Sequence, residues 1–295
     1  MPKIFTLTCN LLAETTLYFN EAHLGRTQRA SRSRFRVGGK GVNVAIFLEN
    51  SGLEVASVIF VGASVGDRCL EFLKSNYKFK TLAIRTNSET REGFVLRDAS
   101  NSQESTFLGC DAYLSDDDFK AAIELIEKEA DAGDILSICG SIPNWSECKF
   151  ELLKRLLSAK PLRLVVDTYA KPLADLASLK SEILKVNSDE FAGISNSLNL
   201  TDASASLESR FKEAALRINS NFFAVTDGGN PAYAYSCGNF YKVVPPRLNC
   251  PVYPTGCGDR LLAELLKSLA TKGFCDIGDF ESAMLCASDF AKLAD

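Results

Sequence analysis

The sequence predicts an α/β fold in which a mostly parallel central sheet is covered by helices on both faces. Short runs rich in Val, Ile and Phe alternate along the chain with segments of helical period. The strand-like runs are apolar throughout, which is typical of parallel strands buried on both faces. We therefore expect a three-layer αβα sandwich with ligands bound at the carboxyl ends of its strands.

The elements follow one another without a linker or an internal repeat. Strands are expected at 3–9, 55–62, 134–140, 162–167, 182–187 and 222–229. Helices are expected at 41–52, 67–75, 116–130, 150–159, 207–218 and 260–273. Because no Pro/Ser-rich stretch divides the chain, residues 1–295 are expected to form a single domain.

Two polar segments, 14–37 and 82–108, interrupt this alternation and carry many β-branched residues. They predict antiparallel strands outside the main sheet, forming a small β-strand lid. In an extended chain, Arg32, Arg34 and Arg36 share one face. These arginines could simply solvate an exposed edge, or some of them could clasp a phosphorylated substrate. Exposed lid edges could also pair between two subunits, so a homodimer is possible.

Composition excludes several classes of partner. The net charge of −4 gives no general affinity for nucleic acid or for an anionic membrane. The ten cysteines are scattered and the chain has one histidine, so a zinc site and a disulfide framework are both poorly supported. No apolar run approaches the roughly 18 residues of a membrane span. A reducing cytoplasm is the expected location.

The first motif with chemical potential is "GGKGVNVA" at 38–45. Its glycines, including Gly39, allow the backbone to approach a ligand closely, while Lys40 offers an ammonium group and Asn43 a donor and an acceptor. The alternative is a glycine-rich turn that merely starts an amphipathic helix. The spacing of a Walker-type phosphate loop is absent.

The second motif, "PTGCGDR" at 254–260, precedes a leucine-rich segment of helical period. Backbone N–H groups around Gly256 and Gly258 can form an anion-binding nest at the positive end of a helix. Asp259 at the lip of this nest could take the proton of an attacking hydroxyl during phosphoryl transfer. Alternatively, Asp259 is only a helix cap.

The third motif, "NSDE" at 187–190, follows an expected strand. Asn187 and Glu190 could together orient hydrated magnesium and nucleotide phosphate, because Mg²⁺ keeps several waters and touches few side chains. The alternative is a capping box in which the two residues begin a helix.

With these motifs in place, the sequence resembles the ribokinase-like carbohydrate kinases of the PfkB family. The resemblance covers nearly the whole chain in order: "FTLTCN", "GGKGVNVA", "TREG", "CGSIP", "VVDT", "KVNSDE", "VTDGG" and "PTGCGD". It implies a ribokinase-like fold and ATP-dependent phosphorylation of a sugar or sugar-phosphate hydroxyl, with Mg²⁺. The family pattern implies that Asp259 is the catalytic base, beside an anion hole of Gly256, Cys257 and Gly258.

The same resemblance implies roles for residues on the nucleotide side. Asn187 and Glu190 match a motif that places magnesium and phosphate, with Glu190 acting through water. Thr226 and Gly228 match the nucleotide-side Ser/Thr-x-Gly pattern. Arg260 stands where the family has a small residue. It could contact the nucleotide phosphates, or it could pair with Glu264 one turn later and be structural.

Within the family, "GGKGVNVA" and "TREG" are most similar to the 1-phosphofructokinase and tagatose-6-phosphate kinase branch. This implies that Gly39, Lys40 and Asn43 contact the sugar and that Arg91 meets the substrate phosphate. Glu14 replaces the aspartate with which the branch grips sugar hydroxyls, and the branch's lysine beyond Arg91 is missing.

These departures leave two alternatives to a sugar-phosphate kinase. The chain could phosphorylate an unphosphorylated sugar or a nucleoside, or it could be a catalytically impaired binding protein. Cys257 adds one further expectation, since a thiol at a helix N-terminus should have thiolate character unless burial cancels it.

Overall fold

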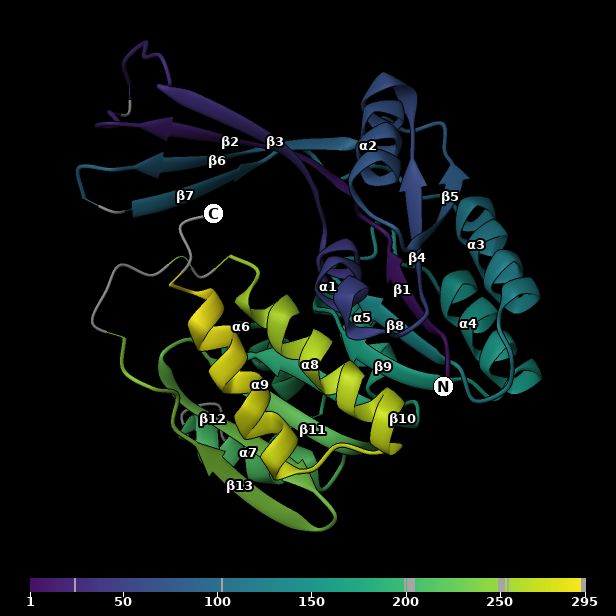
Figure 1. The fold of residues 1–295 in the computed structure, drawn as a ribbon. Helices are drawn as coiled ribbons and strands as arrows, with labels where there is room; N and C mark the ends of the chain where they lie inside the picture. The colour runs from purple at the N-terminus through teal and green to yellow at the C-terminus, as the bar shows by residue number, and fades with distance from the viewer. Residues whose placement is uncertain are drawn as a thin grey trace.

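A nine-stranded sheet forms the middle layer of the computed structural model, which describes residues 1–23, 25–101, 103–198, 200, 205–248, 253 and 255–292 (Figure 1). Its strands are β1 (Ile4–Thr8), β4 (Val55–Val61), β5 (Lys80–Arg85), β8 (Ile135–Cys139), β9 (Arg163–Asp167), β10 (Ser181–Asn187), β11 (Ser220–Asp227), β12 (Asn230–Ser236) and β13 (Asn239–Val243). They lie in the order β13-β12-β11-β10-β9-β8-β1-β4-β5. All pair in parallel except β12 and β13 at one edge, so the predicted mostly parallel sheet is confirmed.

Helices cover both faces of this sheet. One face carries α1 (Lys40–Leu48), α2 (Ala63–Asn76), α8 (Cys257–Lys272) and α9 (Ile277–Phe290). The other carries α3 (Asp116–Glu129), α4 (Glu147–Ala159), α5 (Ala170–Leu176), α6 (Ser188–Ser197) and α7 (Leu207–Ala215). A short 3₁₀ turn, Glu49–Ser51, follows α1. The six helices expected from their periodicity are present, α6 was expected only as the alternative interpretation of "NSDE", and α5 and α9 were not predicted.

Helices α5, α6 and α9 have weak sequence signals. The seven-residue α5 contains Pro172, which normally argues against a helix. In α6 the serines, Gly193 and Asn196 interrupt any apolar stripe. Asp276 and Asp279 form a capping box that starts α9. This signal is polar, so a search for apolar periodicity does not detect it.

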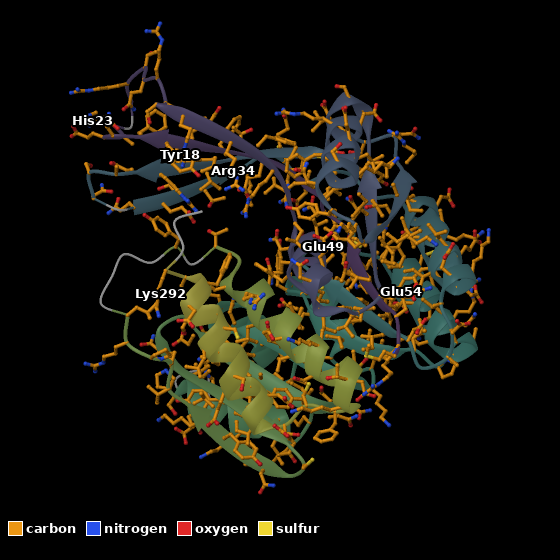
Figure 2. All side chains as sticks on the ribbon, in the orientation of Figure 1. Tyr18, His23, Arg34, Glu49, Glu54 and Lys292 are labelled. Carbon is orange, nitrogen blue, oxygen red and sulfur yellow. The ribbon has the colours of Figure 1, made fainter. Side chains whose placement is uncertain are left out.

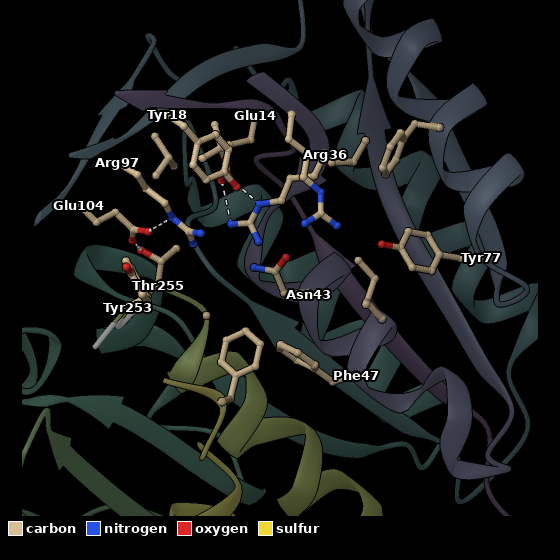
Figure 3. A pocket seen from close by; sticks show the side chains of 18 residues that line it. Glu14, Tyr18, Arg36, Asn43, Phe47, Tyr77, Arg97, Glu104, Tyr253 and Thr255 are labelled. Carbon is tan, nitrogen blue, oxygen red and sulfur yellow. Dashed lines mark hydrogen bonds and ion pairs between the residues drawn. The ribbon is translucent and has the colours of Figure 1, made fainter. Parts of the chain in front are cut away.

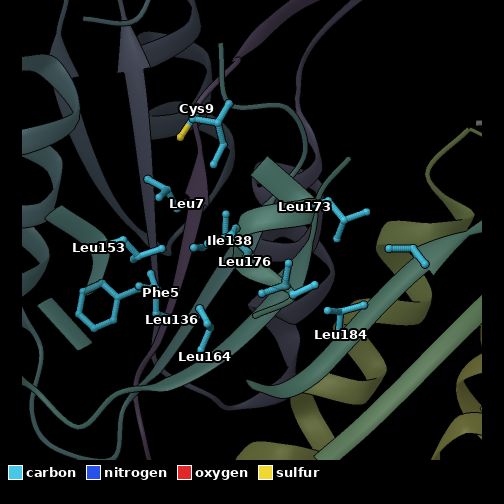
Figure 4. Packing of buried hydrophobic residues seen from close by; sticks show 14 of the residues in the cluster. Phe5, Leu7, Cys9, Leu136, Ile138, Leu153, Leu164, Leu173, Leu176 and Leu184 are labelled. Atoms are coloured by element: carbon cyan, nitrogen blue, oxygen red, sulfur yellow. The ribbon is translucent and has the colours of Figure 1, made fainter. Parts of the chain in front are cut away.

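The core lies on both sides of the sheet, which explains why its central strands are mostly apolar and buried at every position, as in β1, β4 and β8. Along β1, Phe5 and Leu7 pack with α3 and α4, while Ile4 packs on the opposite face with α1 and α8 (Figure 4). Each such side chain contributes about 1.5–3 kcal/mol when it is fully buried. Alternation of polar and apolar residues is therefore absent from the central strands.

A second, four-stranded sheet stands apart from the main one. It contains β2 (Leu12–Phe19), β3 (Arg32–Gly38), β6 (Arg91–Asp98) and β7 (Gln103–Leu108), in the order β3-β2-β6-β7. Figure 2 shows Tyr18 and Arg34 on this small sheet and His23 at its outer end. These strands fall within the two polar segments that the sequence singled out.

Two details of that expectation were wrong. The central pair, β2 and β6, is parallel, not antiparallel. Both strands follow strands of the main sheet that run in the same direction, so they leave its edge in the same direction as well. Residues 82–85 belong to β5 of the main sheet. Within the segment 82–108, the strands of the small sheet therefore begin only at Arg91.

The order of strands reverses its direction between β1 and β8. From β1 the chain proceeds outward through β4 and β5, and it then returns to build β8 to β11 on the other side. Ligands in open α/β sheets bind at such a reversal point, beyond the carboxyl ends of the strands. Among the described helices, none is long and apolar enough to cross a membrane.

Because α8 packs against the sheet, truncation of one of its buried side chains should strongly lower the free energy of unfolding. Leu266 in α8 is fully buried, so Leu266→Ala should lower the free energy of unfolding by about 2–5 kcal/mol. Leu285 in the adjacent α9 is 55% exposed, and Leu285→Ala should change it by less than about 0.5 kcal/mol. Chemical denaturation of both variants measures the difference, and equal losses would contradict this account of the core.

Candidate active site

Asp259 lies in the first turn of α8, where the sequence placed a catalytic base. Gly256 is the N-cap of the helix and has φ 88°, a left-handed conformation that favours glycine. The first amides of an α-helix have no carbonyl partner within the helix, so they remain available to an anion. The structure thus brings a buried carboxylate and a potential anion site together on one helix end.

Asn43 connects this end of α8 to α1. Its side-chain Nδ2 donates a hydrogen bond of 2.7 Å to Oδ2 of Asp259. The close approach of α1 depends on glycine, because a Cβ at Gly41 would lie 2.4 Å from Oγ1 of Thr8 and one at Gly39 would lie 2.7 Å from its methyl carbon. The motif "GGKGVN" therefore positions Asn43 against Asp259, as well as starting a helix.

The environment of Asp259 makes it a better base than an ordinary carboxylate. Burial, followed by the negative charge of Asp167, raises the pKa of Asp259 to about 6, while Lys40, Asn43 and Lys185 oppose the shift. At neutral pH the group is still largely ionised. It can nevertheless accept a proton far more readily than an aspartate with an ordinary pKa near 3.9.

A chain of buried charges lies beside Asp259. The carboxylate of Asp167, at the end of β9, accepts hydrogen bonds from Nζ of Lys40 at 2.6 Å and from Nζ of Lys185 at 2.8 Å. Lys40 also donates to Oε1 of Glu190 at 2.7 Å. Burial opposes ionisation of Asp167, but the two lysines lower its pKa overall. Burial likewise disfavours charged Lys40, yet Asp167 and Glu190 raise its pKa.

Lys185 brings a positive charge to the anion site itself. A Cβ built on Gly258 would lie only 2.9 Å from Nζ of Lys185, so the ammonium group lies directly against the first turn of α8. Sequence reasoning quoted "VVDT" and "KVNSDE" but assigned no role to Asp167 or Lys185. Both residues lie at or near the carboxyl end of a strand, and this position is the sequence signal that could have identified them as site residues.

Asn187 and Glu190 form the reciprocal capping box that was left open as an alternative. The amide of Asn187 donates to Oε2 of Glu190, and the amide of Glu190 donates to Oδ1 of Asn187, both at 2.8 Å. Since Lys40 holds the other oxygen of Glu190, a magnesium ion would fit this residue through a water molecule. In the described part of the chain, no cluster of three or more acidic, His or Cys side chains is arranged to hold a metal directly.

The residues expected on the nucleotide side lie on neighbouring strands. Thr226 in β11 is the register partner of Asn187 in β10. Gly228 follows in a turn with φ 55°. The hydroxyl of Ser188 donates to Asp227 at 2.6 Å and fixes the start of α6 to this turn. Thr226, Gly228 and Asn187 therefore share one edge of the sheet, and their contact with nucleotide remains a prediction.

A cavity of about 210 Å³ opens between the small sheet and the ends of α1, α8 and α9 (Figure 3). Asn43 and Gly256 line it, so the cavity reaches the catalytic helix ends. Glu14 also lines it, as expected of a sugar-binding residue. However, both of its carboxylate oxygens accept from Arg36, with Nε at 2.5 Å and Nη2 at 3.0 Å.

Arg91 does not line this cavity among the described residues. Its Nη1 lies 3.0 Å from Oδ1 of Asp111, and its Nη2 donates to the carbonyl oxygen of Asn10 at 3.3 Å. Asn10 also donates to Asp111 at 2.7 Å, so the three side chains form one cluster. The proposed phosphate-binding arginine is thus already paired with a carboxylate.

Arg260 pairs with Glu264, which is the arrangement expected if Arg260 has a structural role. Its Nη2 lies 2.6 Å from Oε1 of Glu264, and its guanidinium lies 5.4 Å from the centre of the Phe47 ring. At Cys257, burial cancels the expected thiolate character, which is the alternative that was left open. Burial, with the negative charges of Asp259 and Glu104, raises the pKa of the Cys257 thiol to about 11. The nine described cysteines are all free, and Cys250 and Pro254 lie outside the described residues.

Several known proteins are similar to this chain over most of its length. A tagatose-6-phosphate kinase of Staphylococcus epidermidis is 24% identical over 270 residues, covering 90% of this chain and 85% of that protein. The ATP-dependent 6-phosphofructokinase isozyme 2 of Escherichia coli is 24% identical over 274 residues, covering 92% and 86%. The structure of the tetrameric inhibited form of E. coli phosphofructokinase-2 superposes with a TM-score of 0.86 at 22% identity, covering 99% of this chain and 94% of that one, which confirms the ribokinase-like fold.

The pattern of the pfkB family carbohydrate kinases matches residues 9–294. This covers the small sheet, every strand of the main sheet except β1, and every candidate site residue that the sequence predicted. The predicted enzyme class, an ATP-dependent sugar kinase, is therefore confirmed. The chain belongs to the pfkB family of carbohydrate kinases.

Proposed function

We propose that this protein transfers the γ-phosphoryl group of ATP to a hydroxyl group of a monosaccharide phosphate, with Asp259 as the catalytic base. The observation that carries the proposal is the buried Asp259 carboxylate at the N-terminus of α8, oriented by Asn43 and with its pKa raised to about 6. Relatives named as tagatose-6-phosphate kinase and phosphofructokinase support this class of acceptor.

We assign each site residue a separate role in the reaction. Asp259 takes the proton from the acceptor hydroxyl, whose oxygen forms a bond to the γ-phosphorus as the bond from that phosphorus to the β-phosphate oxygen breaks. The backbone amides of Gly256, Cys257 and Gly258 and the ammonium of Lys185 stabilise the negative charge of the transferring group. Asp167 holds Lys185 and Lys40 in place.

The nucleotide is assigned to the other side of the helix ends. We assign its binding to Asn187, Glu190, Thr226 and Gly228, because these residues share the carboxyl edge of β10 and β11. Mg²⁺ would neutralise phosphate charge when bound, and Glu190 would hold it through water. Arg260 is a weaker candidate for phosphate binding because Glu264 already pairs with it.

The small sheet is proposed to act as a lid over the acceptor cavity, within one domain that spans residues 1–295. The hydroxyl of Thr255, next to the anion site, donates to Oε1 of Glu104 in β7 at 2.5 Å, which connects the sheet to the catalytic loop. Phe94 and Phe107, paired across β6 and β7, are 46% and 48% exposed. This apolar pair would suit a homodimer contact through the lid strands.

Removing the base should abolish turnover without unfolding the protein. In Asp259→Asn, the hydroxyl loses its proton acceptor while Nδ2 of Asn43 keeps an oxygen to donate to. The turnover number should fall by at least about 100-fold. Coupled measurement of ADP release with fructose 6-phosphate and tagatose 6-phosphate tests this. Equal turnover by the wild type and the variant would contradict the assigned base.

The activity should depend on pH through the same group. Because Asp259 must be unprotonated, kcat/KM should rise as pH increases to about 6 and level off above it. A phosphorylated acceptor also titrates near pH 6, so a second variant is needed. Asn43→Ala removes a hydrogen bond that lowers the pKa of Asp259, and it should move the midpoint to higher pH. A midpoint that stays fixed would assign the titration to the substrate.

As pH rises, the free energy of unfolding should fall while the activity increases. The pKa of Asp259 is about 6 when folded and about 3.9 when unfolded, so the folded protein loses stability as pH rises through this interval. Asp259→Asn avoids this loss and should be about 1–3 kcal/mol more stable at pH 7, with no gain below about pH 4.

Urea denaturation at both pH values measures this effect. Asp289→Asn, at a side chain that is 75% exposed, is the matched control and should change stability by less than about 0.5 kcal/mol. A gain for Asp259→Asn that is as large at pH 4 as at pH 7 would rule out the burial of charge as its cause.

A further inference from the structure

The inner face of the small sheet contacts the turn that begins α8. The hydroxyl of Thr255 donates to Oε1 of Glu104 in β7 at 2.5 Å, and 151 residues of sequence separate the two (Figure 3). Thr255 directly precedes Gly256, the N-cap of α8. The proton and phosphoryl transfer steps described above do not use Glu104. Its hydrogen bond therefore connects a residue outside the reacting groups to the backbone of the anion site.

The Glu104 carboxylate is itself held firmly on the sheet. Its side chain is only 6% exposed, and its Oε2 accepts a hydrogen bond from Nε of Arg97 at 3.0 Å. The two residues lie directly opposite one another on β6 and β7. A charged acceptor makes a stronger bond to a hydroxyl than a neutral one does, and the guanidinium balances its charge. Glu104 thus offers Thr255 a strong acceptor with little net negative charge beside the anion site.

Arg97 also contacts the segment that leads into α8. Its guanidinium lies 4.7 Å from the centre of the Tyr253 ring, a distance typical of a cation–π contact. The amide of Tyr253 in turn donates to the carbonyl oxygen of Ala291 at 2.9 Å. Because the N-cap residue is Gly256, it has no side chain that could fix the first turn of the helix. The position of this turn therefore depends on the neighbours that hold Tyr253 and Thr255.

The same contact forms part of the wall of the acceptor cavity. Glu104, Thr255 and Gly256 all line the cavity, together with Asn43, which donates to Asp259. A molecule that fills the cavity touches the small sheet and the helix end at once, so it favours the arrangement in which the two are in contact. A phosphoryl group at the first amides of α8 favours the same arrangement of the turn. Two ligands that favour one arrangement strengthen each other's binding.

We propose that Glu104 is a positioning residue that connects the acceptor cavity to the anion site, so that acceptor and nucleotide bind with positive coupling through its hydrogen bond to Thr255. This inference rests on the proposed function, because it takes the acceptor to occupy the cavity and the γ-phosphoryl group to occupy the anion site. Glu104 acts on the transferring group through Thr255. By reciprocity, the factor by which the acceptor tightens nucleotide binding equals the factor by which the nucleotide tightens acceptor binding.

Calorimetric titration measures this coupling without turnover. A non-hydrolysable ATP analogue with Mg²⁺ is titrated with and without saturating fructose 6-phosphate or tagatose 6-phosphate. The acceptor should lower the Kd of the wild type for the analogue by at least about 5-fold. Thr255→Val keeps the shape of the side chain but removes the hydroxyl, so the factor should fall below about 2. Thr255→Ser keeps the hydroxyl and should keep most of the coupling.

Variants of the acceptor side of the bond and a matched control complete the test. Glu104→Ala should reduce the coupling as far as Thr255→Val does, and the double variant should lose no more than either single one. Thr271→Val is the control, because this exposed hydroxyl donates to the carbonyl of Lys267 at 2.8 Å at the far end of the same helix. It should leave the coupling unchanged.

Two results would overturn the proposal. One is coupling of wild-type strength in Thr255→Val. The other is weaker binding of both ligands with an unchanged coupling factor, which would show that the bond between Glu104 and Thr255 only supports the fold.

Hydrogen exchange tests the same connection without an acceptor. The ATP analogue with Mg²⁺ should slow exchange of the β7 amides in the wild type, because the turn that it fixes also holds Glu104. This protection should be lost in Thr255→Val and retained in Thr255→Ser. Protection that is absent from the wild type, or that persists in Thr255→Val, would refute the connection. Absence of ADP release with every sugar would contradict the proposed function separately, because the exchange measurement requires neither turnover nor an acceptor.

Discussion

The buried carboxylate of Asp167, held between Lys40 and Lys185, is the interaction on which the rest of the site depends. An unpaired charge in this position would cost several kcal/mol, so both lysines must reach it. Lys40 comes from the start of α1 and also reaches Glu190 at the start of α6, while Lys185 comes from β10. One acid therefore fixes the relative positions of two helix starts and two strands. Asn43 stands one turn beyond Lys40, so its contact with the base follows from the same constraint.

The charges in this network explain why Asp259 differs from its neighbours. Two lysines face three carboxylates, and the hydrogen bonds of Lys40 and Lys185 go to Asp167 and Glu190. Among the side chains that the structure describes, the neutral amide of Asn43 donates a hydrogen bond to Asp259, and no ammonium or guanidinium group does. Burial is the main cause of the raised pKa of Asp259 and the negative charge of Asp167 adds to it, while Lys40, Asn43 and Lys185 offset only part of the shift. Asp259 therefore stays available as a proton acceptor, because the nearby ammonium groups donate their hydrogen bonds to other carboxylates.

Much of the fold could be predicted because burial on both faces makes the central strands predominantly apolar, as in β4 and β8. Pairing between distant strands could not, so the parallel contact of β2 with β6 was missed. In the site, the glycine motifs singled out Asp259 and Asn43 separately, and only the structure shows that their side chains are hydrogen-bonded. Asp167 received no role because its partner Lys40 is 127 residues away in the sequence. Whether Cys257 has thiolate character could not be decided from the sequence, because the degree of burial that raises its pKa is not visible in a local motif.

The burial of Asp259 also bears on how this sequence is maintained by selection. A carboxylate with a raised pKa lowers the stability of the fold at neutral pH, and a single change to asparagine would relieve it while keeping the contact with Asn43. Under selection for folding or ligand binding alone, mutation would drift toward that amide. The acid is present, within an intact glycine-rich helix start. Such a residue is expected in a lineage that is still selected for chemistry, and it argues against a protein that has kept only the shape of a kinase.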